Sequence, residues 1–344
     1  MKTMAKKKGR DLRPYLSAGL TMVLWASAFP GIRAGLHAYS PAHLAVLRYA
    51  AASLTLGGYA LVKHLRLPGF RDLVRMALLG LVGIAYYGVA LNTGELSVPS
   101  AVASFLINTA PIFVALAARI WLGERLHRLG WLGILISFSG VAVIAWSGMA
   151  GLTIDSHALL IVSAAFAFSL YVVGQKPLLT RYTAVEFATY AVWASACFLL
   201  FFFPGLPEEI RAAPLRDTLA VIYLGVFPAA LGYITWAYAL AHLPASRAAS
   251  FLYLQPLLVL GIAWVWLGEW PSVLALCGGV LVLAGVMVVN ARRQGFAEAS
   301  PLRFRAERLR ASRRPWHACL SNSVAPSGAD PRAREQDAQS DQPS

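Results

Sequence analysis

Ten apolar runs, each close to the length of a bilayer-spanning helix, divide most of this 344-residue chain. A hydrocarbon core about 30 Å thick needs about 20 apolar residues of α-helix to cross it. Since 58% of the residues are hydrophobic and only 13% are charged, a soluble fold could not bury the apolar surface. The sequence therefore predicts an all-α polytopic membrane protein. Its ten predicted transmembrane helices cover roughly residues 15–36, 42–62, 74–93, 98–120, 129–147, 156–176, 183–203, 217–239, 245–267 and 272–291.

Lysine and arginine residues set the predicted orientation. If the helices alternate from a cytoplasmic N-terminus, eighteen basic residues fall in inside segments, and only Arg33, Arg211 and Arg216 fall in outside segments. Because cytoplasmic loops are enriched in Lys and Arg, both termini are predicted to be cytoplasmic. The net charge of +14 does not indicate nucleic-acid binding, since no basic stripe with interleaved aromatic residues lies outside the apolar runs.

One stretch of the chain is present twice. Residues 99–124 align without a gap with residues 244–269, and nine of the 26 positions are identical. The identities include a mid-helix proline, Pro111 and Pro256, and a closing Trp-Leu-Gly-Glu. A duplicated half explains this similarity. The register continues through glycines seven residues apart, which predict close helix contact: Gly133 and Gly140 in the first copy, Gly278 and Gly285 in the second.

The duplication predicts an inverted architecture. Each half has five helices, an odd number, so the second half must enter the membrane in the opposite orientation, as in many secondary transporters. The two five-helix repeats are residues 15–147 and 156–291, between a basic cytoplasmic N-terminus, 1–14, and a cytoplasmic tail, 292–344. The tail is basic and then rich in Ser, Asp, Gln and Pro, which predicts disorder. Its basic part either touches anionic headgroups or stays solvated.

The first apolar run has a competing interpretation as a signal peptide. A basic segment precedes it, and Ala26-Ser27-Ala28 resembles a cleavage site. We favour a helix, because the apolar character continues to Leu36 and cleavage would leave the first half one helix short.

Signatures of enzymes, metal sites and ATP-driven pumps are missing from the sequence. It contains no His-Glu-x-x-His, Gly-x-x-x-x-Gly-Lys, Gly-x-Gly-x-x-Gly or Gly-x-Ser-x-Gly motif. Its three cysteines, Cys197, Cys277 and Cys319, form no Cys-x-x-Cys pair. We therefore expect no enzyme activity, no metal and no cofactor, and we expect any pumping to draw on a gradient or a partner.

The duplicated stretch, with its mid-helix proline, its closing Leu-Gly-Glu and the glycine-spaced helix that follows, resembles the EamA domain of the drug/metabolite transporter superfamily. Trp25-Ala26-Ser27-Ala28-Phe29, Leu47-Arg48-Tyr49 and Gln255-Pro256 also fit that domain. The resemblance covers about residues 15–290. It implies a ten-helix basket of two inverted repeats, and export of amino acids, related metabolites or drugs. Two positions depart from the family pattern: Asn92-Thr93-Gly94-Glu95 adds a carboxylate near the outer face, and Gln255 stands where an acidic residue is frequent.

Polar groups inside a bilayer are costly, so each is a candidate functional residue. Arg48 either neutralises a substrate carboxylate or snorkels and ties helices together. Asn108 and Gln255 precede the paired prolines, each of which leaves a backbone carbonyl without its usual partner. Amide and carbonyl together would form a neutral polar cradle, unless the kink only improves packing. Trp25 and Trp236 either offer a cation–π surface or pack.

The candidate residues fall into three groups. The predicted substrate pathway comprises Trp25, Arg48, Asn92, Asn108, Pro111, Tyr171, Trp236, Tyr253, Gln255 and Pro256. Glu95 and Glu186 are candidates for proton coupling or gating, and ordinary solvation also explains Glu186. Glu124 and Glu269, which close the duplicated stretch, are expected to cap or gate rather than to bind.

We therefore predict a secondary transporter that exports small metabolites, amino acids or related compounds, across the bacterial inner membrane by alternating access. Its expected partners are a small-molecule substrate and the lipid bilayer, with no nucleic acid, and a homodimer is left open. The alternatives are a multidrug or nucleotide-sugar transporter, or a membrane receptor or enzyme that transports nothing.

Overall fold

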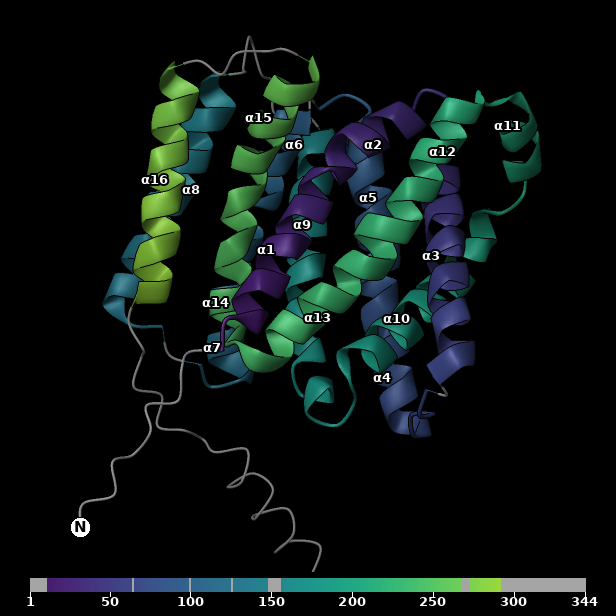
Figure 1. Ribbon diagram of the computed structural model, residues 1–344, viewed down its shortest axis with the longest axis horizontal. Coiled ribbons are helices and arrows are strands. Elements are labelled where there is room, and N and C mark those ends of the chain that lie inside the picture. Colours follow the sequence, from purple (N-terminus) through teal and green to yellow (C-terminus); the bar gives the residue numbers. More distant parts are fainter. Residues whose placement is uncertain are drawn as a thin grey trace, which may run out of the picture. The chain divides into compact units, whose positions relative to one another are not determined.

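The computed structural model describes residues 11–63, 65–98, 100–124, 126–147, 156–267 and 273–291 (Figure 1). All regular elements in these ranges are helical. The first half contains α1 (Arg13–Ala26), α2 (Ala28–Gly35), α3 (Pro41–Lys63), α4 (Phe70–Gly80), η1 (Leu81–Tyr86), α5 (Tyr87–Gly94), α6 (Ser100–Ile107), α7 (Ala110–Trp121) and α8 (Arg128–Ser147). The second half contains α9 (Ser156–Gln175), η2 (Leu178–Thr180), α10 (Ala184–Leu199), η3 (Leu200–Phe202), α11 (Leu206–Ala212), α12 (Leu215–Leu224), η4 (Gly225–Leu231), α13 (Gly232–His242), α14 (Ala245–Ser250), η5 (Phe251–Tyr253), α15 (Leu254–Leu267) and α16 (Val273–Ala291).

Each of the ten predicted apolar runs is helical. Seven helices within the described ranges are long and apolar enough to cross a membrane, and α8 and α16 contain shorter apolar segments, Arg128–Val143 and Leu276–Val289. The chain is thus a multi-pass membrane protein. Ten crossings and two cytoplasmic termini stay predictions. Residues 1–10, Glu269 and the tail from residue 292 lie outside the described residues.

The helices are interrupted at matching positions of the two halves. Pro99 and Pro244 lie 145 residues apart in the duplicated stretch. The π-helical segments η1 and η4 begin at Leu81 and Gly225, which is nearly the same offset. A π-helical turn opens the backbone hydrogen-bond ladder and is frequent at functional sites. The two halves therefore share an irregularity as well as a sequence pattern.

Both copies of the duplicated stretch form a broken helix. The first is divided between α6 and α7, and the second is divided into α14, the 3₁₀ turn η5 and α15. Pro111 lies in the first turn of α7 and Pro256 in the first turn of α15. Because proline has no N–H and its ring clashes with the preceding turn, a continuous α-helix cannot pass through these positions unbent.

The two broken helices pack crosswise, α7 against α14 and α15 against α6. Other contacts between the halves also occur in matching pairs. Helix α1 of the first half packs on α13 of the second, and α9 of the second packs on α5 of the first. In the same way, α3 packs on η4 and α10 packs on η1. This reciprocity is what an inverted repeat produces.

Helices α8 and α16 lie side by side (Figure 1), and the glycine stripe predicted from the sequence forms their interface. A Cβ atom on Gly133 would lie 2.8 Å from the carbonyl oxygen of Gly285, and one on Gly140 would lie 2.7 Å from that of Gly278. Only hydrogen at these positions lets the two backbones come this close. The predicted close packing is confirmed at Gly133, Gly140 and Gly285.

Candidate functional site

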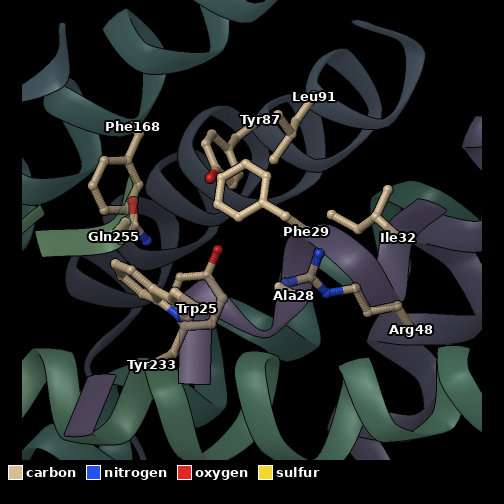
Figure 2. Close-up of a pocket in the computed structure, with 10 residues that line it drawn as sticks. All are labelled: Trp25, Ala28, Phe29, Ile32, Arg48, Tyr87, Leu91, Phe168, Tyr233 and Gln255. Atoms are coloured by element: carbon tan, nitrogen blue, oxygen red, sulfur yellow. The ribbon is translucent and has the colours of Figure 1, made fainter. Parts of the chain in front are cut away.

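A narrow cavity of about 20 Å³, room for about one water molecule, lies where both halves of the chain meet (Figure 2). Its walls come from the α1–α2 junction, α3, α5, α9, α13 and α15. The lining residues are Trp25, Ala28, Phe29, Ile32, Arg48, Tyr87, Leu91, Phe168, Tyr233 and Gln255. The first seven belong to the first repeat and the last three to the second.

Arg48 is the only residue of this lining that carries a permanent charge. Its side chain is only 4% exposed, and its Nε has no hydrogen-bond partner. Among the described residues, no carboxylate lies within 4 Å of its guanidinium. The guanidinium carbon lies 5.4 Å from the ring centroid of Tyr49. A buried charge without a counter-ion is costly, so this cavity offers an unusually strong site for an anion.

A close backbone contact holds Arg48 in place. A Cβ atom on Gly225, at the start of η4, would lie 2.5 Å from the carbonyl oxygen of Arg48. The missing side chain lets α3 pack directly against η4. Gly80, 145 residues earlier, allows the same approach to the carbonyl of Ala191 in α10, so this contact also repeats in the two halves.

Aromatic rings form the opposite wall of the cavity. The ring centroid of Trp25 lies 5.5 Å from that of Phe168 and 5.7 Å from that of Tyr233, both in edge-to-face geometry. Trp25 Nε1 donates a hydrogen bond of 3.0 Å to the carbonyl oxygen of Pro228 in η4, which fixes the indole. Aromatic faces attract cations and also accept apolar groups.

Gln255 adds a polar group to this aromatic wall. It is 3% exposed, and its Oε1 has no hydrogen-bond partner. Because it directly precedes Pro256, the break in the duplicated helix brings its amide to the cavity. The cavity thus combines a cation, an aromatic wall and a free amide acceptor.

The other predicted pathway residues lie outside the lining. Trp236 and Tyr171 pack directly behind it, with ring centroids 5.3 Å from Trp25 and 6.1 Å from Phe168, respectively. Asn108 donates through Nδ2 to the Ser104 carbonyl, 2.6 Å away. The remaining members, Asn92, Pro111, Tyr253 and Pro256, are all buried. Asn92 donates to the Pro41 carbonyl, and Tyr253 belongs to a smaller apolar cluster that includes residues of α8 and α16.

The predicted acidic residues lie away from the cavity lining. Glu186 closes a capping box with Thr183 at the start of α10, and its Oε1 accepts the backbone N–H of Arg66, 3.1 Å away. Glu95 is 8% exposed at the end of α5. Glu124 caps a helix of the other repeat: it accepts the backbone N–H of Ala245 at 2.8 Å.

Sequence reasoning missed Phe29 and Phe168 as lining residues. Phe29 belongs to the Trp-Ala-Ser-Ala-Phe motif, one helical turn after Trp25. Phe168 lies one turn before the predicted Tyr171 on α9. Helical spacing from the predicted aromatic residues would have found both.

The chain matches a family model described as the EamA-like transporter family, over residues 12–146 and 156–291. "Uncharacterized transporter YdfC" of Bacillus subtilis is 42% identical over 272 residues, 79% of this chain and 89% of that protein. "Probable terminal-alkyne amino-acid exporter" of Streptantibioticus cattleyicolor is 43% identical over 276 residues, 80% of this chain and 93% of that protein. "Uncharacterized inner membrane transporter YedA" of Escherichia coli K12 is 28% identical over 285 residues, 81% of this chain and 92% of that protein.

The fold is also known from a crystal structure. That chain superposes with a TM-score of 0.66 at 20% sequence identity, over 81% of this chain and 96% of its own length. At this identity the match shows a shared fold alone.

Proposed function

This chain belongs to the EamA-like transporter family, and on that basis we propose that it is a secondary transporter that exports small, amino-acid-like metabolites across the bacterial inner membrane by alternating access. The observation that carries the substrate class is Arg48, a buried guanidinium without a carboxylate partner among the described residues. A substrate carboxylate would supply the missing counter-ion through a charge-assisted, bidentate contact.

The rest of an amino acid fits the opposite wall. Its ammonium group would lie against the faces of Trp25 and Tyr233 and donate to Oε1 of Gln255, which has no partner of its own. Cation–π contacts of this kind contribute about 0.5–2 kcal/mol each. An apolar side chain would contact Phe29 and Phe168. A zwitterion therefore finds a partner for each of its charges.

The charge of the cavity lining argues against a nucleotide sugar as the substrate. A nucleotide sugar carries two phosphates, whereas Arg48 is the single cationic residue of the lining. The lining thus matches one carboxylate best.

The names of two relatives support export as the direction of transport and the inner membrane as its location. One is named "Probable terminal-alkyne amino-acid exporter", and another is named "Uncharacterized inner membrane transporter YedA". Export from the cytoplasm needs an energy source, and the buried Glu95 is our candidate for exchanging protons during the cycle.

The paired prolines lead to a prediction about turnover. Replacing Pro111 or Pro256 with Ala should lower the transport rate several-fold at unchanged membrane levels, because an N–H at either position lets the helix continue through its break. Initial rates in vesicles, normalised to protein amount, measure the effect. Pro41→Ala is a matched control, since Pro41 opens α3 without interrupting it. Wild-type rates in both mid-helix variants would remove the prolines from the mechanism.

The proposed function itself is tested by metabolite profiling. Cells that express the chain and cells that express Arg48→Gln are compared for amino acids in the medium and in the cytoplasm. We expect a set of small neutral amino acids or analogues to accumulate in the medium only with the wild-type chain. Identical profiles for the wild type, the variant and the empty vector would refute the proposal.

A further inference from the structure

Three fully buried polar side chains lie behind the cavity without hydrogen-bond partners. They are Tyr171, Gln175 and Trp236, each with 0% of its surface exposed. The unpartnered atoms are the Tyr171 hydroxyl, both amide atoms of Gln175 and Trp236 Nε1. An unpaired buried polar atom costs about 1–3 kcal/mol, and native proteins satisfy nearly all of them. These groups therefore indicate a second state in which water or a solute reaches them.

The three residues follow one another in a single direction away from the cavity. On α9, Phe168 lines the cavity, Tyr171 lies one turn further and Gln175 two turns further, about 10 Å beyond Phe168. On α13, Tyr233 lines the cavity and Trp236 lies one turn further.

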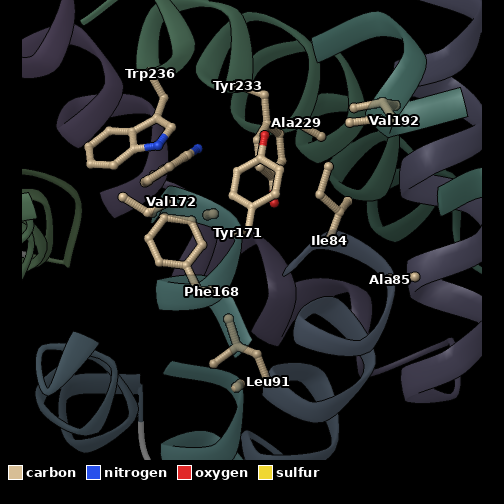
Figure 3. Close-up of a cluster of buried hydrophobic side chains, with 14 of the residues drawn as sticks. Ile84, Ala85, Leu91, Phe168, Tyr171, Val172, Val192, Ala229, Tyr233 and Trp236 are labelled. Carbon is tan, nitrogen blue, oxygen red and sulfur yellow. The ribbon is translucent and has the colours of Figure 1, made fainter. Parts of the chain in front are cut away.

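Aromatic contacts join these two helices across the same region. The ring centroid of Phe168 lies 5.9 Å from that of Trp236, and that of Tyr171 lies 5.9 Å from that of Tyr233. Figure 3 shows Phe168, Tyr171, Tyr233 and Trp236 in one buried cluster. The tilted and edge-to-face rings fill the space between α9 and α13, so a solute in the cavity cannot pass while they keep this arrangement.

Two opposite charges hold the far end of this region. Lys176, the residue after Gln175, donates from Nζ to the carbonyl oxygens of Leu240 and Leu243, where α13 ends. The Glu124 carboxylate accepts the backbone N–H groups of Ala245 and Ser246, at 2.8 and 3.2 Å, where α14 begins. Helix ends leave just these carbonyl and N–H groups without intrahelical partners. The cation and the anion thus clamp the α13–α14 turn from both sides.

The end of the duplicated stretch explains how Glu124 reaches the other repeat. Gly123 has a φ of +67°, a conformation that glycine adopts without the penalty of a Cβ. The N–H groups of Leu122 and Glu124 both bond to the Ala118 carbonyl, which closes α7 and turns the chain. The Leu-Gly-Glu of the first copy therefore ends one helix and caps a helix of the opposite half.

We infer that a second, closed segment of the substrate path runs from the cavity between α9 and α13, lined by Tyr171, Gln175 and Trp236, and that Glu124 and Lys176 seal its end by clamping the α13–α14 turn. This inference rests on the proposed transport function. The predicted orientation places the clamp on the cytoplasmic side. When the clamp opens, the unpaired polar atoms gain water or substrate as partners, and the substrate enters from the cytoplasm toward Arg48.

Cysteine labelling tests this inference without a substrate. Gln175→Cys is introduced into a chain whose Cys197, Cys277 and Cys319 are replaced by Ser, and inside-out vesicles are treated with a membrane-impermeant maleimide. We expect slow labelling of the parent and labelling at least several-fold faster after Glu124→Ala. Glu124→Gln, which keeps the side-chain volume, should give an intermediate rate.

Glu208→Ala is the control, since Glu208 is an exposed carboxylate in the first turn of α11, and it should leave the labelling rate unchanged. Rapid labelling of the parent, equal rates with and without Glu124, or an equal rise in the Glu208 variant would each overturn the clamp. Labelling reports water access alone, so it distinguishes the two proposals. Labelling that depends on Glu124 without any transport would refute the proposed function and support the clamp. Transport with labelling that does not depend on Glu124 would support the proposed function and refute the clamp.

Discussion

Replacing Arg48 with Gln should abolish most transport while leaving the protein folded. A charge-assisted hydrogen bond to a carboxylate contributes about 1.5–3 kcal/mol, which corresponds to a loss of about 10- to 150-fold in kcat/KM. Arg48→Lys should recover only part of the rate, because an ammonium cannot form the bidentate contact of a guanidinium.

The same variant separates a functional role of Arg48 from a structural one. If Arg48 tied helices together, its loss would destabilise the fold. No described carboxylate pairs with it, so its removal leaves no orphaned partner and relieves the cost of a buried charge. We therefore expect the apparent Tm of Arg48→Gln in detergent to equal or exceed that of the wild type.

Arg33→Gln is the matched control for this experiment. Arg33 lies on the last turn of α2, close in sequence to the cavity residue Ile32, but it is exposed. Its removal should change neither transport nor Tm. If Arg48→Gln lowers both the apparent Tm and the transport rate, Arg48 supports the fold. If this variant transports at the wild-type rate, Arg48 does not bind substrate.

Replacing Gly285 with Leu should strongly destabilise the fold. A Cβ atom at this position would lie 2.5 Å from the carbonyl oxygen of Gly133, so any side chain forces α8 and α16 apart. Overpacking a tight contact costs about 1–3 kcal/mol or more, and we expect the apparent Tm to fall by about 5 °C or more. Fluorescence-detected size-exclusion chromatography after heating measures this shift.

Gly58→Leu provides the comparison, because Gly58 is also a helical glycine but has no atom within 4 Å of its would-be Cβ. It should fold as the wild type does. An unchanged Tm for Gly285→Leu would mean that α8 and α16 do not depend on this contact.

Both the repeat and the close glycine contact between α8 and α16 could be predicted from the sequence. Glycines seven residues apart mark one helical face, and that spacing located the α8–α16 interface at Gly133 and Gly285. Trp25, Arg48 and Gln255 were chosen because polar and amphipathic groups are costly inside a bilayer, and all three line the cavity. The sequence displays such local costs directly and so singles out these residues, and their role in transport stays a prediction.

Other features could not be found from hydropathy, for a physical reason. Lipid and the protein interior are both apolar, so hydropathy alone does not tell which face of α9 turns inward, and only helical spacing from the predicted Tyr171 distinguishes Phe168. The exposed Phe166, two residues earlier, shows how alike the two faces are. The partner of Glu124 lies 121 residues away in the other half, and only the packing of the two repeats brings them together.

Counterflow into proteoliposomes that contain only the purified chain tests the central claim most directly. Liposomes loaded with a neutral amino acid such as leucine are diluted into the radiolabelled compound, and the assay is repeated across a panel of neutral amino acids. We predict transient accumulation of at least one member, inhibited by the unlabelled amino acid but not by its decarboxylated amine, and lost in Arg48→Gln. Accumulation no greater than in empty liposomes across the panel, or equal accumulation with Arg48→Gln, would contradict the account.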